Sequence, residues 1–234
     1  MRALHLVVGI GFTALSCLPS TLMAQDAPTF STGMIPGDHI FMPDDEPKAS
    51  VFLISDAGGW GPDDEAQAKA LVDKGAAVVG IDFPSYLKAL QADDGDCVYM
   101  ISDVEDLAHQ MQRVGGATSY SLPIVAGIGE GGALALAMIS QSPAATVGQA
   151  VAVDPAAGIP LTKELCTPAE KTKTQDRIVY GFTDGPLPAP VTILLTDKAP
   201  QDGRNHAAAL KQAHDDVDIS DETDTPSHPV TEIT

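Results

Sequence analysis

The stretch LPIVAGIGEGGALALAM, residues Leu122 to Met138, decides the fold. An apolar run typical of a buried strand leads into a glycine-dense turn, and an alanine-rich segment typical of a helix follows. A strand that passes into a helix through a tight turn is the repeating unit of an open, doubly wound α/β sheet. The turn is therefore predicted to lie at the carboxyl edge of such a sheet, where ligands bind in these folds.

Apolar runs and helix-like runs alternate on both sides of this stretch. The predicted buried strands cover residues 50–55, 76–82, 122–128, 147–154 and 190–196, with short edge strands at 39–43 and 217–220. The predicted helices cover about residues 63–74, 102–114, 131–141 and 205–214. Ser102 is the expected N-cap of the second helix, with Glu105 completing a capping box. Strands separated by helices predict a mainly parallel, doubly wound sheet.

Residues 155–189 interrupt this alternation with glycines, prolines and a charged run. This segment is interpreted as an insertion, with a strand near RIVYGF at 177–182.

The amino terminus has the three-part pattern of a secretory signal peptide. Arg2 precedes the apolar run LVVGIGFTALSCLP, and small residues precede Gln25, so cleavage is expected after Ala24. The predicted organisation is a signal peptide at 1–24, a leader at 25–38, one α/β domain at 39–214 and an acidic tail at 215–234. No segment after residue 24 is long and apolar enough to cross a bilayer, so the exported chain is not expected to be transmembrane.

Charge and cysteine content narrow the classes of partner. The chain carries a formal net charge of −19, which becomes −20 when the segment containing Arg2 is removed. Such a surface repels phosphate backbones, which excludes nucleic acid as an expected partner, and it tolerates or attracts cationic ligands. Cys97 and Cys166 remain after export to an oxidising compartment, and a disulfide between them is expected.

The turn at 127–131 stands where an α/β-hydrolase carries its nucleophile. Those enzymes place G-x-S-x-G at a strained strand-to-helix elbow, and the register here reads Gly127-Ile128-Gly129-Glu130-Gly131. The serine position is therefore occupied by Gly129. The predicted fold class is a degenerate, α/β-hydrolase-like, doubly wound sheet.

A second group of candidate residues follows the strand at 50–55. Ser55-Asp56-Ala57-Gly58-Gly59-Trp60 would form an anion-binding nest there, in the place where hydrolases keep half of their oxyanion hole. The alternative is a tight turn that needs two glycines, with Trp60 packed over the core. The predicted ligand-binding residues are Ser55, Asp56, Gly58, Gly59, Trp60, Gly129 and Glu130.

The other members of a hydrolase triad have candidates in the expected order. Asp197 follows the last buried strand and His228 follows the predicted edge strand, so acid and histidine come after the elbow as in a triad. Glu130 offers a different reactive group beside the serine position, although a carboxylate at a helix start is also stabilised without catalysis. These three residues are the candidate remnants of a catalytic site.

Cofactor and metal sites have weaker support. Gly127, Gly129 and Gly132 satisfy G-x-G-x-x-G, and Asp154 follows 22 residues after the last of them, which suits a dinucleotide fingerprint. That fingerprint normally opens the first βαβ unit, whereas at least two strands precede it here. His206 and His214 have no metal-ligand spacing. No cofactor and no metal are expected.

Several long stretches together resemble the AcvB/VirJ virulence-protein family. They are ISDAGGW, GAAVVGIDFPSYLKAL, DDGDCVYMISDVEDL, LPIVAGIGEGGALALAMI, AVAVDPAAGIPL and YGFTDGPLP, and the resemblance runs from about residue 38 to the tail. The chain is similar to the N-terminal, non-catalytic half of AcvB. The resemblance implies a periplasmic protein with an α/β-hydrolase fold, in a family linked to virulence and type IV secretion in plant-associated bacteria.

The resemblance also implies a partner and a chemistry. AcvB-type proteins consist of two VirJ-like halves, of which the C-terminal half carries the serine of G-x-S-x-G and is associated with hydrolysis of lysyl-phosphatidylglycerol. A companion active half, secretion components or a cationic lipid headgroup are the implied partners. Serine catalysis does not transfer, because Gly129 replaces the nucleophile.

Three hypotheses follow from the sequence. The first is a periplasmic pseudo-hydrolase that binds a ligand or partner at the strand ends. The second is an active hydrolase of an aminoacyl-phospholipid or another ester, with a non-serine site around Glu130, Asp197 and His228. The third is a nucleotide-binding protein.

Overall fold

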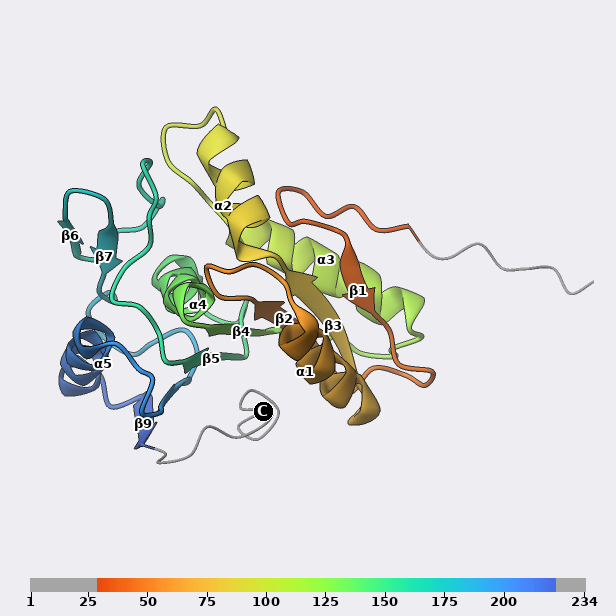
Figure 1. Ribbon diagram of the computed structural model, residues 1–234. Coiled ribbons are helices and arrows are strands. Elements are labelled where there is room, and N and C mark those ends of the chain that lie inside the picture. Colours follow the sequence, from red (N-terminus) through yellow and green to blue (C-terminus); the bar gives the residue numbers. More distant parts are fainter. Residues whose placement is uncertain (1–28, 222–234) are drawn as a thin grey trace, which may run out of the picture.

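A seven-stranded sheet with the strand order β1-β3-β2-β4-β5-β8-β9 forms the centre of the computed structural model (Figure 1). The structure describes residues 29–221, so the predicted signal peptide and His228 lie outside the described residues. The strands of this sheet are β1 (His39–Phe41), β2 (Ala49–Ile54), β3 (Ala76–Ile81), β4 (Ile124–Ile128), β5 (Gln149–Val153), β8 (Val191–Leu195) and β9 (Val217–Asp221). A separate hairpin pairs β6 (Lys171–Lys173) with β7 (Ile178–Tyr180).

The sheet is parallel except at one edge. β1 runs antiparallel to β3, and every other neighbouring pair is parallel. The carboxyl ends of β2, β4 and β5 therefore lie side by side, with Ile54 opposite Gly127 and Ile128 opposite Val153. This edge carries the residues after each strand, including the glycine turn. The predicted doubly wound, mainly parallel sheet is confirmed.

Five helices are described between and beside the strands. They are α1 (Pro62–Asp73), α2 (Phe83–Ala92), α3 (Ile101–Val114), α4 (Glu130–Gln141) and α5 (Gln201–Ala213). None of the helices within residues 29–221 is long and apolar enough to span a membrane.

Alternating residues of the strands divide the core into two layers. Phe52 and Ile54 of β2 pack on the side of α3 and α4, whereas Val51 and Leu53 pack on the side of α1. Figure 1 shows α1 and α3 on opposite sides of β2 and β3. Both faces of the central strands are thus covered, which explains why those strands read as continuous apolar runs.

The predicted N-cap at Ser102 is wrong. Helix α3 begins at Ile101 with Met100 in the cap position, and Met100 makes no side-chain cap. The buried side chain of Gln141 replaces the cap, since its Oε1 accepts the N–H of Met100 at 3.2 Å and its Nε2 donates to the carbonyl of Val98 at 2.5 Å. A tertiary contact from α4 therefore sets the start of α3.

Helix α2 is an element that the sequence-based assignment lacks. Asp82 caps it by accepting the N–H of Ser85 at 3.0 Å, and a proline lies in its first turn. Both features favour a helix start. Tyr86 and Leu90 bury its inner face completely.

Two contacts fix the segments that flank α2 and α3. The expected disulfide joins Cys97, before α3, to Cys166 in the excursion between β5 and β8. The last part of the leader packs on α3, where the side chain of Gln110 both accepts from the N–H of Ser31 and donates to its carbonyl, each at 2.9 Å. Ile35, also in the leader, is 2% exposed.

Candidate functional site

Gly129 connects β4 to α4 in the backbone conformation of a sharp elbow. Its φ is 56° and its ψ is −116°, a region that glycine enters freely and other residues enter only with strain. The flanking glycines are required by close packing, because a Cβ at Gly127 would lie 2.2 Å from the carbonyl oxygen of Gly131. At Gly131 a Cβ would lie 2.3 Å from the carbonyl oxygen of Ser55. The turn thus has the geometry of a nucleophile elbow, with no side chain at its tip.

The side chain of Asp56 fills the space in front of Gly129. A Cβ added to Gly129 would lie 2.1 Å from Oδ1 of Asp56, so the carboxylate stands where a nucleophilic side chain would begin. The same oxygen accepts a hydrogen bond from the backbone N–H of Glu130 at 2.8 Å. In α/β-hydrolases the N–H of the residue after the nucleophile is one donor of the oxyanion hole. That donor is therefore already engaged by the chain's own carboxylate.

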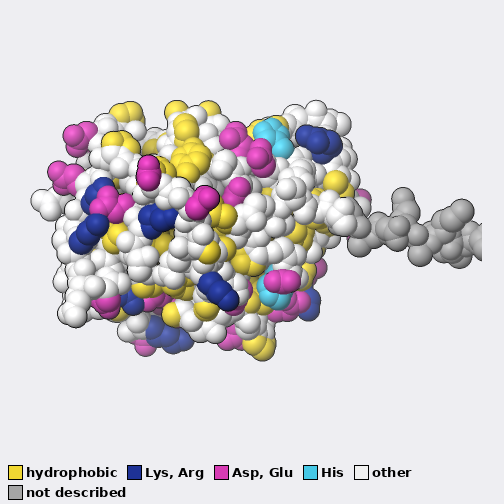
Figure 2. All heavy atoms as spheres, turned by 90° about the horizontal axis from the view of Figure 1, so that it is seen from above, with side chains coloured by type: hydrophobic (Ala, Val, Ile, Leu, Met, Phe, Trp, Pro, Cys, Tyr) yellow, Lys and Arg dark blue, Asp and Glu magenta, His cyan; other side chains and the backbone are white. Residues whose placement is uncertain are grey.

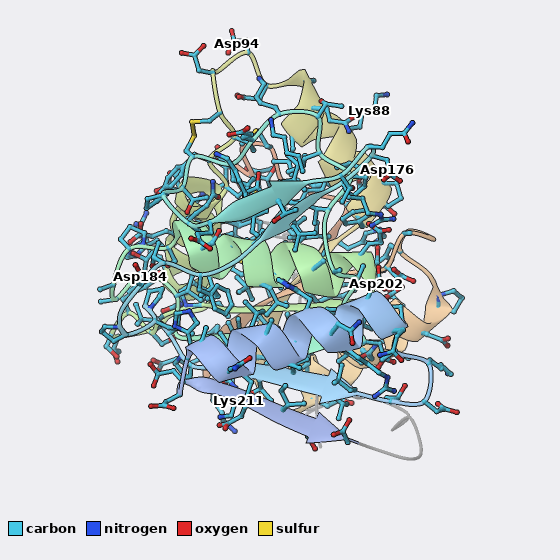
Figure 3. All side chains as sticks on the ribbon, turned by 90° about the vertical axis from the view of Figure 1, so that its left-hand side faces the viewer. Lys88, Asp94, Asp176, Asp184, Asp202 and Lys211 are labelled. Carbon is cyan, nitrogen blue, oxygen red and sulfur yellow. A yellow bond between two sulfur atoms is a disulfide. The ribbon has the colours of Figure 1, made fainter. Side chains whose placement is uncertain are left out.

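An open cleft of about 480 Å³ lies at this edge of the sheet. Its lining includes Asp56, Ala57, Gly129, Glu130, Asp154, Arg177, Lys198 and Asp202. Four carboxylates and two cationic side chains thus converge on one cleft, from the ends of β2, β4, β5 and β8, the start of α5 and the β6–β7 hairpin. Figure 3 shows Asp176 of the hairpin turn and Asp202 of α5 at the same end of these two elements.

Glu130 is held by an ion pair with Arg177. The guanidinium of Arg177 donates to Oε1 of Glu130 and, at 2.9 Å, to the carbonyl of Gly158. The hydrogen bond with Glu130 raises the pKa of Arg177, with burial opposing the shift. The second oxygen of Glu130, Oε2, is buried and has no hydrogen-bond partner among the described residues. The ion pair therefore fixes the orientation of the Glu130 carboxylate through Oε1.

Asp154 also lines the cleft, although it is not among the catalytic candidates Glu130, Asp197 and His228. Its φ of 45° is a strained, left-handed value for a residue with a side chain. Both of its oxygens accept hydrogen bonds at 2.6 Å, one from the N–H and one from the hydroxyl of Thr196. Asp197, the predicted triad acid, is exposed and does not line the cleft. The end of β8 therefore binds Asp154 through Thr196, and Asp197 points elsewhere.

Of the seven predicted ligand-binding residues, the structure brings Asp56, Gly129 and Glu130 together in the cleft. Ser55 is fully buried, and its hydroxyl accepts the N–H of Phe83 at 3.1 Å, so it fastens β2 to the start of α2. Gly58 is exposed and lies outside the cleft lining.

Gly59 and Trp60 also lie away from the cleft. The backbone N–H of Trp60 donates to Asp82 at 2.7 Å, and its indole stacks on His39 at 4.9 Å over β1 and β3. A Cβ at Gly80 would lie 2.4 Å from this indole, so the ring packs directly on the sheet. Ser55, Gly58, Gly59 and Trp60 are therefore not part of the lining of the cleft that contains Gly129, and their role in ligand binding stays a prediction.

Sequence reasoning missed Arg177 and Lys198 as members of the cleft. Lys198 follows the end of β8, where the rule that parallel strands point their carboxyl ends at the ligand could have found it. Arg177 had no such signal, because it comes from the irregular excursion, 47 residues after Glu130. Among residues 29–221 no group of three or more potential ligands is arranged to hold a metal ion.

The comparisons with known proteins identify the fold. No protein-family model and no curated protein matches the sequence. The structure is similar to poly(aspartic acid) hydrolase-1 from Sphingomonas sp. KT-1, with a TM-score of 0.55, 13% identity and coverage of 83% of this chain and 90% of the other. It is also similar to the acylaminoacyl peptidase of Pyrococcus horikoshii, with a TM-score of 0.50, 12% identity and coverage of 79% of this chain and 34% of the other. With its mainly parallel sheet and glycine elbow, the chain has the α/β-hydrolase fold.

Proposed function

We propose that this protein is a pseudo-hydrolase, a hydrolase-type domain that uses its strand-end cleft to bind a ligand instead of cleaving it. The contact of Asp56 with the N–H of Glu130, in front of an elbow without a nucleophile, carries this proposal. Acyl transfer requires a nucleophile at the elbow and free donors for the oxyanion. Gly129 supplies no nucleophile, and the Asp56 carboxylate both occupies the donor and repels a developing negative charge.

We further propose that the protein works in the periplasm as a member of the AcvB/VirJ family, with links to virulence, type IV secretion and lysyl-phosphatidylglycerol metabolism. The support is the sequence resemblance, the signal-peptide pattern and the disulfide between Cys97 and Cys166, which suits an oxidising compartment. In this proposal the cleft holds a cationic headgroup or docks an active VirJ-type half. Its four carboxylates against two cations suit a positively charged group.

Activity measurements test the pseudo-hydrolase proposal. The purified chain is assayed against p-nitrophenyl acetate and against lysyl-phosphatidylglycerol in mixed micelles, with heat-denatured protein as the background. We expect no turnover above background with either substrate. Turnover that disappears in Glu130→Gln would overturn the proposal in favour of a non-serine hydrolase, the alternative function.

Binding measurements test the ligand of the cleft. Vesicles of phosphatidylglycerol with and without lysyl-phosphatidylglycerol are co-sedimented with the wild type, Asp56→Asn, Asp202→Asn and Asp73→Asn. Asp73 is exposed at the end of α1 and outside the cleft, so it controls for the change in net charge. We expect the two cleft variants to lose binding to lysyl-phosphatidylglycerol vesicles and the Asp73 variant to retain it. Equal losses in all three variants would exclude the cleft as the headgroup site.

A further inference from the structure

A second and larger cleft lies between the β6–β7 hairpin and helix α5. Its volume is about 600 Å³, within the range of roughly 300–1,000 Å³ that is usual for small-molecule sites. Figure 3 shows Asp184, from its lining, at the opposite end of the hairpin and α5 from Asp176 and Asp202. No residue is shared between the linings of the two clefts, so this cleft is independent of the site described above.

The floor of the second cleft is apolar and aromatic. Phe182 and Leu210 line it and are 7% and 4% exposed, respectively. The ring of His214 meets Phe182 edge-on, with ring centroids 5.5 Å apart and an interplanar angle of 68°. Such a floor offers dispersion contacts to an apolar ligand body, and the face of a phenyl ring also attracts cations.

A histidine forms the inner wall. The side chain of His206 lines this cleft and also a small apolar pocket behind it, beside Ile178 and Tyr180. Burial lowers the pKa of His206, and a hydrogen bond to the backbone of Tyr180 opposes the shift. The imidazole is therefore neutral at pH 7 and adds no positive charge to the wall.

The rim is acidic. The side chains of Glu170 and Asp184 are exposed at the mouth, and neither takes part in an ion pair among the described residues. Lys171 also lines the cleft, and its ammonium group shares the carboxylate of Glu164 with that of Lys173. Glu164, Glu170 and Asp184 face only Lys171 and Lys173, so the mouth keeps one net negative charge over an apolar floor. This arrangement complements a ligand with an apolar body and a positively charged end.

We propose that the cleft between the β6–β7 hairpin and α5 is a binding site for small amphiphilic amines. The apolar body lies on Phe182 and Leu210, and the ammonium group lies between Glu170 and Asp184 at the mouth.

Three ligands with one phenyl body and different charges test the proposal. Phenethylamine, 2-phenylethanol and 3-phenylpropionate are titrated into the full chain, and the imidazole signals of His206 and His214 are followed by NMR. We expect saturable shifts with phenethylamine, weaker binding of the alcohol, and binding of the carboxylate that is weaker than that of the amine by roughly tenfold or more. Equal affinities for all three ligands would overturn the proposed ligand class.

A pair of tryptophan variants tests the location. Ala208 and Ala209 are neighbouring exposed alanines on α5, and only Ala209 lines the cleft. Ala209→Trp should abolish the amine-dependent shifts by filling the cleft, whereas Ala208→Trp should leave them unchanged. Equal behaviour of the two variants would place the amine elsewhere and overturn the proposal.

Neutral substitutions of the two rim carboxylates test their role in binding without disturbing the fold. Glu170→Gln combined with Asp184→Asn should weaken phenethylamine binding by about threefold to tenfold, with no effect on 2-phenylethanol. Because both side chains are exposed, these variants should unfold at the same temperature as the wild type. An unchanged affinity for the amine in a folded double variant would overturn the role of the rim.

Discussion

Oδ1 of Asp56 accepts the N–H of Glu130 at 2.8 Å and stands in the space that a Cβ at position 129 would need. One carboxylate thus takes up both the position of a nucleophile and a donor of the oxyanion hole. The backbone has the shape of an elbow, and an internal contact of the Asp56 side chain fills the space in front of it. Mutations at this contact should therefore change stability as well as any latent reactivity.

Gly129→Ala should destabilise the protein through both strain and collision. The φ of 56° alone costs about 1–3 kcal/mol for a residue with a Cβ, and the carboxylate of Asp56 must also move. Gly116 provides the matched control, because its φ is 81° and no atom lies within 4 Å of an added Cβ. Urea unfolding should show a larger loss of unfolding free energy for Gly129→Ala than for Gly116→Ala. In a chain that already carries Asp56→Gly, Gly129→Ala should cost about as much as Gly116→Ala. Equal losses for the two alanine variants would show that Asp56 does not crowd position 129.

Arg177 and Glu130 should contribute to the free energy of unfolding in a coupled way, because they form an ion pair. Arg177→Ala leaves the Glu130 carboxylate, 13% exposed, without its partner, and an unsatisfied buried group of this kind costs about 1–3 kcal/mol. Adding Glu130→Gln removes the stranded charge and should restore part of that stability. Chemical unfolding of the wild type, both single variants and the double variant gives the coupling energy. Additive losses would contradict a direct interaction.

His206 should make stability depend on pH in the mildly acidic range. Burial holds the pKa of its ring below 6.5 in the folded state, so the unfolded chain binds more protons as the pH falls through that value. Its contribution is complete above pH 6.5 and is lost as the pH falls toward the folded-state pKa. His206→Gln lacks this contribution, so the stability difference between wild type and variant should shrink below pH 6.5. A difference that is independent of pH between about 5 and 8 would contradict the buried, neutral ring.

The disulfide should contribute strongly to stability. Cys97 and Cys166 are 69 residues apart, and closing a loop of that length in the unfolded chain stabilises a protein by about 2–4 kcal/mol. The double variant Cys97→Ser and Cys166→Ser should therefore have a free energy of unfolding lower by about 2–4 kcal/mol, measured by denaturant titration. In excess reductant the wild type should unfold at the same denaturant concentration as the double variant. The reductant should not change the unfolding midpoint of the double variant. A loss below about 1 kcal/mol would show that the unfolded chain is not constrained by this link.

The sheet could be predicted from the sequence because buried parallel strands read as continuous apolar runs. The strands at 50–55, 76–82 and 190–196 were each placed within one residue of β2, β3 and β8. The elbow was placed correctly because its glycines are demanded by backbone packing, which leaves a fixed spacing in the sequence.

The contents of the cleft were harder to predict because they depend on side-chain direction. Asp56 contacts Gly129, whereas Trp60, four residues later, packs on Gly80. Arg177 reaches Glu130 only because the excursion folds back over α4. Asp154 faces the cleft and accepts two hydrogen bonds from Thr196, whereas the neighbouring Asp197 is exposed. None of these relationships has a periodic signature.

Acidic side chains are common on the face of the molecule that is drawn in Figure 2. Figure 2 shows acidic side chains scattered over one face of the molecule with basic ones between them, and no continuous basic area is visible on that face.

The elbow at Gly129 is fixed by close contacts between backbone segments. Three backbone segments, at Ser55, Gly127 and Gly131, meet so closely that only glycines fit two of the positions. Close backbone packing therefore requires the sharp turn, whatever side chain stands at position 129. The backbone gives this protein the α/β-hydrolase fold, and the elbow differs from a nucleophile elbow in two side chains, the one absent at position 129 and the one present at position 56.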